Sequence, residues 1–239
     1  MARLNNLVFV VIFFVSMAVS WFIWDNSPEY LKQGGPLLVL GLTLLFLVLT
    51  FCIERWIVLW RAGGRGNAAA FIRNMRASIR EGDIPGATES CKKQGGSLAN
   101  VVGAGLQRYQ AVRGPTEEKE ALKETRQAIE EAHSLETPLL ERNLSALATL
   151  ASIATLLGLL GTTVGMIRAF RAMSQAGAPD ATQLALGISE ALVNTAMGLT
   201  TAIVGTVLYN YFTSRVDSFN NAIEQTTYEV LQILEHRDS

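Results

Sequence analysis

The feature that most constrains this chain is the scarcity of charge in four long windows of its sequence. Each window is at least 21 residues long and carries one charged residue or none; they cover residues 4–24, 33–53, 143–167 and 181–214. A helix needs about 20 apolar residues to cross the roughly 30 Å of hydrocarbon in a bilayer. The sequence therefore predicts an all-α integral membrane protein and excludes a purely soluble globular protein and a disordered chain.

Composition narrows the class further. The net charge is -1, so the chain has no large basic field that would attract nucleic acid. Two cysteines (Cys52 and Cys91) and two histidines (His133 and His236) are too few for a disulfide framework or a metal cluster. P-loop, dinucleotide, HExxH and GxSxG motifs are absent from the sequence. We expect neither an enzyme nor a bound cofactor or metal.

The windows divide the chain into seven segments. We expect transmembrane helices at 37–60, 143–167 and 184–212 as the core. Between them lie a cytoplasmic helical insert at 61–142 and a periplasmic connection at 168–183, and a cytoplasmic helical tail follows at 213–239. Residues 1–36 hold an apolar segment and a short periplasmic loop. That segment is either an extra transmembrane helix or a cleaved secretory signal, and its aromatic end, Trp21 to Trp24, favours the helix.

The distribution of basic residues predicts the orientation. Six arginines follow the second window between residues 55 and 80, whereas residues 25–32 contain a single basic residue, Lys32. Because cytoplasmic loops are enriched in Lys and Arg, the insert and the C-terminus are expected in the cytoplasm. Arg168 and Arg171 fall on the outer side and run against this rule.

The insert and tail are expected to be helical. Glycines mark loops at 63–66 and 95–96 and, with Pro115, at 114–115; a helix starting at Thr116 is expected to run into the third window, bent at Thr137-Pro138. The tail has a heptad rhythm, which predicts that the fourth span continues to about residue 234 as one packed helix. The positions of this seam are Phe212, Val216, Phe219, Ile223, Thr226, Val230 and Ile233.

Small residues recur inside the last two spans. Small residues at spacings of three and four let helix backbones approach closely in lipid, so we predict that these glycines serve helix packing. They are Gly158, Gly161 and Gly165 in the third span and Gly187, Gly198 and Gly205 in the fourth.

Polar side chains inside these spans are the candidate functional residues. Ser152, Thr155 and Thr162 share one face of the third span, and Thr195 lies in the fourth. They either line a bundle interior or a water-filled path, or they bond back to their own helix. Glu190 either serves a function inside the membrane or lies near the outer interface, paired with an arginine at 168 or 171.

Two stretches carry a family resemblance. Residues 140–172 read LERNLSALATLASIATLLGLLGTTVGMIRAFRA, and residues 187–210 read GISEALVNTAMGLTTAIVGTVLYN. They resemble the MotA/TolQ/ExbB proton channel family, within it the ExbB/TolQ branch, over about the last hundred residues. The resemblance implies a homopentameric ring in the bacterial inner membrane, surrounded by lipid. A single-span ExbD- or TolR-like partner inside the ring would carry the titrating aspartate, and proton flow would energise a TonB- or TolA-like protein in nutrient import or envelope maintenance.

The same resemblance assigns residues. Thr162, Thr195 and Glu190 match the family's pore threonines and glutamate. Thr155 departs from the family by replacing a proline, and Asn194 by replacing a small residue. Two other functions stay open at this point, a MotA-like flagellar stator and a non-conducting membrane scaffold.

Overall fold

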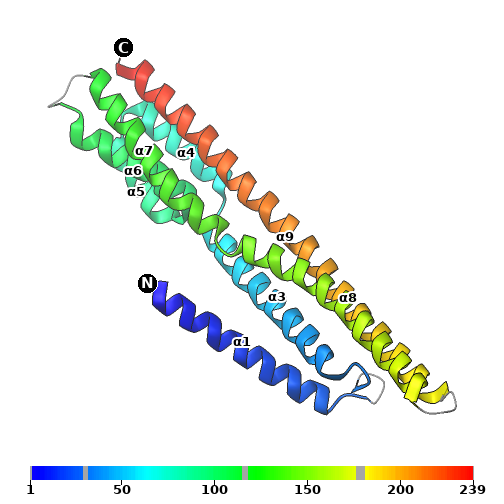
Figure 1. Ribbon diagram of the computed structural model, residues 1–239. Coiled ribbons are helices and arrows are strands. Elements are labelled where there is room, and N and C mark those ends of the chain that lie inside the picture. The colour runs from blue at the N-terminus through cyan, green and yellow to red at the C-terminus, as the bar shows by residue number, and fades with distance from the viewer. Residues whose placement is uncertain (1, 29–31, 115–117, 176–180, 239) are drawn as a thin grey trace. The chain divides into compact units, whose positions relative to one another are not determined.

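The computed structural model describes residues 2–28, 32–114, 118–175 and 181–238. The regular elements in these ranges are α-helices, and the ranges contain no β-strand, so the prediction of an all-α chain is confirmed (Figure 1). The helices are α1 (Ala2–Asp25), α3 (Gly35–Ala62), α4 (Ala68–Glu81), α5 (Ile84–Gln94), α6 (Gly96–Val112), α7 (Glu118–Glu141), α8 (Leu144–Gln175) and α9 (Ala181–Asp238).

Within the described ranges, three helical stretches are long and apolar enough to cross a membrane. They are Gly35–Ala62, Glu118–Ser174, whose apolar part is α8, and Ala181–His236. These stretches contain the three core spans predicted from the sequence, so the chain is a membrane protein. The apolar part described for α1, Val10–Asp25, is shorter than these spans, and a fourth, N-terminal span stays a prediction.

The chain forms two compact units. The membrane unit comprises residues 1–54 and 143–210, and the polar unit comprises residues 55–142 and 211–239. Two helices, α3 and α9, contribute to both. α9 is 58 residues long, about 87 Å at 1.5 Å per residue, which is far longer than a bilayer span requires.

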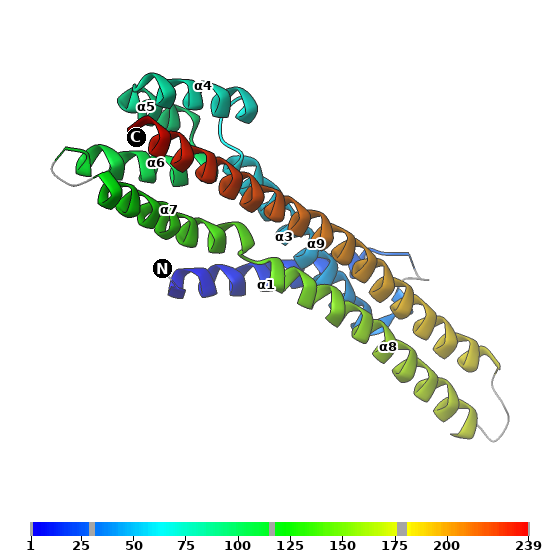
Figure 2. The same ribbon diagram turned by 90° about the horizontal axis from the view of Figure 1, so that it is seen from above.

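In the membrane unit, α8 and the first part of α9 run side by side in opposite directions (Figures 1 and 2). Both helices leave large apolar side chains exposed, among them Leu156 on α8 and Leu192 and Ile203 on α9. Such side chains are stable in contact with lipid tails, which are as apolar as leucine. The contact between the two helices must therefore rest on something other than burial of large apolar groups.

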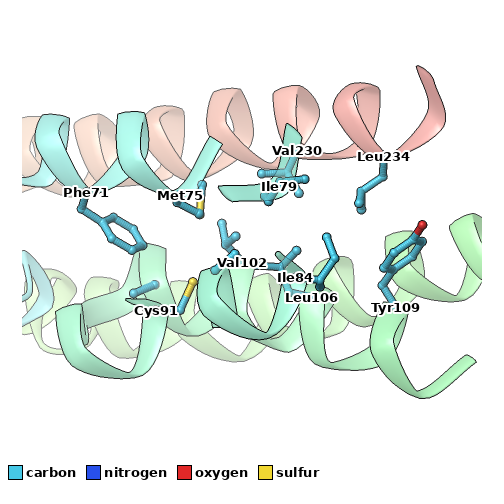
Figure 3. Packing of buried hydrophobic residues seen from close by; sticks show 12 residues of the cluster. Phe71, Met75, Ile79, Ile84, Cys91, Val102, Leu106, Tyr109, Val230 and Leu234 are labelled. Carbon is cyan, nitrogen blue, oxygen red and sulfur yellow. The ribbon is translucent and has the colours of Figure 1, made fainter. Parts of the chain in front are cut away.

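The polar unit has a conventional hydrophobic core. Side chains of α4, α5, α6 and the end of α9 meet in one cluster (Figure 3). Met75 and Ile79 of α4, Leu106 of α6 and Leu234 of α9 are fully buried there. Most positions of the predicted seam are buried, including Phe212, Val216, Ile223, Thr226 and Val230, and at its end Leu234 is the buried residue where the seam had Ile233.

The predicted bend at Thr137-Pro138 stays a prediction, because α7 is continuous there and a proline can bend a helix without ending it. α7 continues through Pro138 to Glu141, and the helical path breaks at Asn143, which has a φ of 61°. Asparagine tolerates this left-handed conformation better than most residues. The Leu140 carbonyl, close to the end of α7, accepts a hydrogen bond from Arg55 Nη1 at 3.3 Å, and Arg55 is fully buried. The break therefore lies where a side chain replaces a lost backbone partner.

Other boundaries also differ from the sequence prediction. α8 continues to Gln175, past the expected end at residue 167, and α9 begins at Ala181 rather than 184. Much of the expected connection at 168–183 is thus helical, and its part at 176–180 lies outside the described residues. The predicted helix start at Thr116 also lies outside them, as does Pro115 of the loop before it.

Candidate functional site

The centre of the α8–α9 contact is built from two glycines. A Cβ placed on Gly198 would lie 2.6 Å from the carbonyl oxygen of Ala154 and 2.7 Å from the Cα of Gly158. A Cβ on Gly158 would lie 3.3 Å from the Cα of Gly198. No side chain fits at either position without moving a backbone. The two helices touch here backbone to backbone.

The other four predicted glycines lie along the same contact, three on one side of this centre and one on the other. Gly161 faces Asn194, Gly165 faces Ala191, Gly187 faces Ala169 and Gly205 faces Ala151. On α8 the contact runs from Ala151 to Ala169, which is about 27 Å at 1.5 Å per residue. That length is close to the roughly 30 Å of a bilayer's hydrocarbon. The structure thus places all six glycines in one continuous seam of membrane dimensions.

The candidate hydroxyls differ in their partners. Ser152 and Thr162 donate to carbonyls of their own helix, Ala148 at 3.0 Å and Leu159 at 2.7 Å. Thr155 lies 3.4 Å from the Ala151 carbonyl, also within α8. On α8, then, the hydroxyls bond back, which was one of the two interpretations of the sequence. Their oxygens retain lone pairs that can accept a further hydrogen bond.

Thr195 is different because it links the two helices. Its hydroxyl lies 3.0 Å from the Gly158 carbonyl of α8 and 3.1 Å from the Ala191 carbonyl of α9. The short approach at Gly158 brings that carbonyl within reach. One side chain therefore couples the hydrogen bonding of both helices at the centre of the glycine seam.

Glu190 lies near the start of α9 and is buried, with 8% of the residue exposed. Its Oε1 forms an ion pair with Arg168 Nη1 of α8, whose side chain is about half exposed. Of the two arginines considered from the sequence, the described contact is with Arg168. A buried carboxylate requires such a partner, because desolvation disfavours an isolated charge.

Ser189 and Gln33, which had no predicted role, and Asn194, predicted only as a departure from the family, complete this end of the membrane unit. Ser189 Oγ donates to Gln33 Oε1 at 2.6 Å, and Asn194 Nδ2 donates to the Gly34 carbonyl at 2.9 Å. A cavity of about 250 Å³ opens beside them, lined in part by Gln33, Arg168 and Glu190. Asn194 in place of a small residue was the sequence signal for this contact, and it did not identify the partner.

The polar groups gathered at this site are hydrogen-bonding groups and one ion pair. Among the described residues, no three His, Cys, Asp or Glu side chains lie together as metal ligands would. These polar groups are hydroxyls of α8 and α9, backbone carbonyls, the Asn194 amide and the Glu190–Arg168 ion pair. Such groups exchange hydrogen bonds with water or with a carboxyl group but supply no nucleophile with an activating base.

The chain is similar in sequence to known membrane proteins. The model of the MotA/TolQ/ExbB proton channel family matches residues 94–225, which is more than half of the chain. The Tol-Pal system protein TolQ of Pseudomonas aeruginosa is 29% identical over 198 residues, covering 80% of this chain and 85% of TolQ. The biopolymer transport protein ExbB of Neisseria meningitidis serogroup A is 28% identical over 224 residues, covering 90% of this chain and all of ExbB.

A shorter match is closer in sequence. The TolQ of Haemophilus influenzae is 38% identical over 104 residues, which cover 44% of each protein. In this match and in one to an ExbB-like protein of Synechocystis, the chain spans less than half of the relative's length. The matched family region includes both helices of the glycine seam. The chain belongs to the MotA/TolQ/ExbB proton channel family, on its ExbB/TolQ branch.

Proposed function

We propose that this chain is the ring-forming subunit of an inner-membrane proton channel. With an ExbD- or TolR-like single-span partner it uses the proton-motive force to energise a TonB- or TolA-like protein at the outer membrane. The result would be TonB-dependent import or envelope maintenance. The observation that carries the proposal is the α8–α9 seam, in which Thr195 joins two backbones brought together by glycine.

The seam supports this function because it combines rigidity with available hydroxyls. Backbone contacts along about 27 Å hold α8 and α9 as one element. Thr162, Thr155 and Ser152 lie on α8 with their own protons already donated, so their oxygens are free to accept. A protonated carboxyl on a partner would find acceptors there, and a carboxylate would find water held by the same oxygens.

The proposed topology follows the distribution of charge. α3, α8 and the first part of α9 cross the inner membrane, and α1 adds a fourth crossing. The polar unit and the C-terminus lie in the cytoplasm, on the side where the six arginines between residues 55 and 80 are found. The Glu190–Arg168 pair then lies at the periplasmic end of the seam.

The ring itself is part of the proposal. Five copies would surround a pore lined by α8 and α9, with the partner's single helix inside and lipid outside. The large exposed apolar residues of these helices, such as Leu156 and Leu192, provide surfaces for lipid and for neighbouring copies.

Native mass spectrometry of the chain co-expressed with such a partner tests the proposal. The expected result is five copies of this chain holding a smaller number of partner copies. An assembly that forms but never captures the partner would contradict the motor function and support a scaffold. Thr163→Val and Thr162→Val variants should both assemble, since neither hydroxyl bonds to another helix.

A further inference from the structure

The turn that precedes α3 makes contacts with α9 that neither the family resemblance nor the channel proposal accounts for. Residues 33–35 meet Ser189, Glu190 and Asn194, which lie more than 150 positions later in the chain. Two of these contacts are hydrogen bonds, Ser189 Oγ to Gln33 Oε1 and Asn194 Nδ2 to the Gly34 carbonyl. We call residues 33–35 the α3 turn.

The third contact involves Glu190 directly. Gly35 has a φ of +63°, and a Cβ placed on it would lie 3.2 Å from Glu190 Oε1. The carboxylate therefore lies against the first residue of α3, in a space that only glycine leaves open. The same Oε1 is paired with Arg168 Nη1. Glu190 is thus held where the start of α3 meets α8 and α9.

Asn194 joins the turn to the backbone of α9 at Glu190. Its Nδ2 donates to the Gly34 carbonyl at 2.9 Å and to the Glu190 carbonyl, one turn earlier in α9, at 3.0 Å. Both partners are acceptors, so the amide must present its nitrogen to them. The Oδ1 is buried without a hydrogen-bond partner, which means that Asn194 acts here through its donors.

Space for Asn194 exists because residue 161 is glycine. A Cβ on Gly161 would overlap the Cβ of Asn194, so the seam itself seats the asparagine side chain. The residue is 5% exposed. A small residue at 194 would fill less of this space and would leave the Gly34 carbonyl without its donor.

We propose that the α3 turn holds α9 in place at the periplasmic end of the seam, an arrangement that we call the lock. Asn194 is the positioning residue that maintains it. The lock fixes Glu190 between Gly35 and Arg168 while proton flow takes place. This inference rests on the proposed function for its consequence, but the lock itself is a structural claim that can be tested separately.

The first test measures the lock by cross-linking. Gln33→Cys and Ser189→Cys are introduced into a background with Cys52→Ala and Cys91→Ala, and disulfide formation is followed after adding copper-phenanthroline. We expect rapid cross-linking with Asn194 present and at least fivefold slower cross-linking after Asn194→Ala. The control is Leu192→Ala, an exposed residue on the same helix, which should leave the rate unchanged. An unchanged rate in Asn194→Ala would overturn the lock.

The second test asks whether the lock positions Glu190 for function. Proton uptake is measured in liposomes containing the complex with its single-span partner. Asn194→Ala should lower uptake at least fivefold. Slow oxidation of the 33–189 cysteine pair in that variant should restore uptake, because the disulfide connects the α3 turn to α9 in place of the lost Asn194–Gly34 hydrogen bond. Failure of the closed disulfide to restore uptake would overturn the positioning role. No uptake in the unaltered complex would count against the proposed function, and the cross-linking rate would still decide the lock.

Gly35→Ala tests the contact between the α3 turn and Glu190 from the side of the turn. Its matched control is Gly66→Ala, because Gly66 has a similar φ of +79° but no atom within 4 Å of its would-be Cβ. Both substitutions strain the backbone, but only the first displaces the Glu190 carboxylate. We expect Gly35→Ala to reduce proton uptake at least fivefold more than Gly66→Ala; equal effects would contradict the contact with Glu190.

Discussion

The membrane unit and the polar unit hold their helices together in opposite ways. In the membrane unit α8 and α9 touch through glycine and alanine, with Gly198 against Gly158 at the centre and large apolar residues pointing outward. In the polar unit α4, α5, α6 and α9 meet through large residues such as Met75, Ile79 and Leu106. The same kinds of residue thus lie outside one contact and inside the other.

The solvent explains the difference. Burying an apolar side chain away from water stabilises a fold by about 25 cal/mol per Å² of apolar surface. In lipid that gain disappears, because leucine is as well solvated by lipid tails as by another helix. Close backbone approach and shape complementarity remain, and glycine is the residue that permits them. The two units should therefore respond to opposite kinds of substitution.

The largest effect should come from adding volume to the seam. Gly198→Leu would place a side chain where even a Cβ lies 2.6 Å from the Ala154 carbonyl oxygen, so we expect less than a tenth of the normal yield of monodisperse protein in detergent. The neighbouring Leu199→Ala removes volume at an exposed position and should leave the yield within twofold. Size-exclusion chromatography of both variants checks this, and a normal elution profile for Gly198→Leu would refute the packed seam.

In the polar unit the large effect should come from removing volume. Met75 is fully buried in the core cluster, and Met75→Ala should lower the free energy of unfolding by about 2–5 kcal/mol. Leu135 is 73% exposed on α7, and Leu135→Ala should change it by less than about 0.5 kcal/mol. Thermal unfolding in one detergent compares the two. Equal effects would mean that the polar unit is not held by this cluster.

A smaller and asymmetric effect is expected at the ion pair. Arg168→Gln leaves the buried Glu190 carboxylate without its partner, whereas Glu190→Gln leaves an arginine that is half exposed and can be solvated. The arginine substitution should therefore destabilise more, by about 1–2 kcal/mol. A double-mutant cycle on thermal unfolding measures the coupling. A larger loss from Glu190→Gln would contradict the assignment of Glu190 as the buried member.

The smallest effect concerns the thiol in the core of the polar unit. Burial raises the pKa of Cys91 from 9.0 to about 11, so the folded state keeps its proton between these pH values while the unfolded state loses it. Stability from this group is complete below pH 9 and falls as pH rises towards 11. At pH 8, Cys91 in a Cys52→Ala background should react with Ellman's reagent only after unfolding; rapid reaction in the folded protein would show that the cluster is open.

Patterns that repeat along one helix could be predicted from the sequence, whereas contacts between segments far apart in the sequence could not. Charge-poor windows predicted the three core spans. The heptad rhythm of the tail predicted a buried helix face that includes Ile223 and Val230. The break in the helical path does not lie at Pro138, through which α7 continues to Glu141. Asn143, with Arg55 bonded to the Leu140 carbonyl, marks the actual break.

The candidate site shows the same division. Small-residue spacing predicted that the six glycines serve helix packing, and the structure brings all six to one contact. The spacing of hydroxyls could not say that Thr195 reaches across to α8, since that depends on a carbonyl exposed by glycine. Nor could it predict the α3 turn on α9, because Asn194 bonds to the backbone of Gly34, and backbone acceptors leave no signature in sequence.

Proton uptake measured in liposomes would show whether the hydroxyls of α8 lie on a proton path. Liposomes containing the complex with its single-span partner would carry a potassium diffusion potential and a pH-sensitive dye. Thr162 and Thr163 both donate to the Leu159 carbonyl from adjacent positions, so Thr163→Val is the matched control for Thr162→Val. We predict that Thr162→Val abolishes uptake while Thr163→Val retains at least half of it. Normal uptake in the assembled Thr162→Val complex would contradict the account.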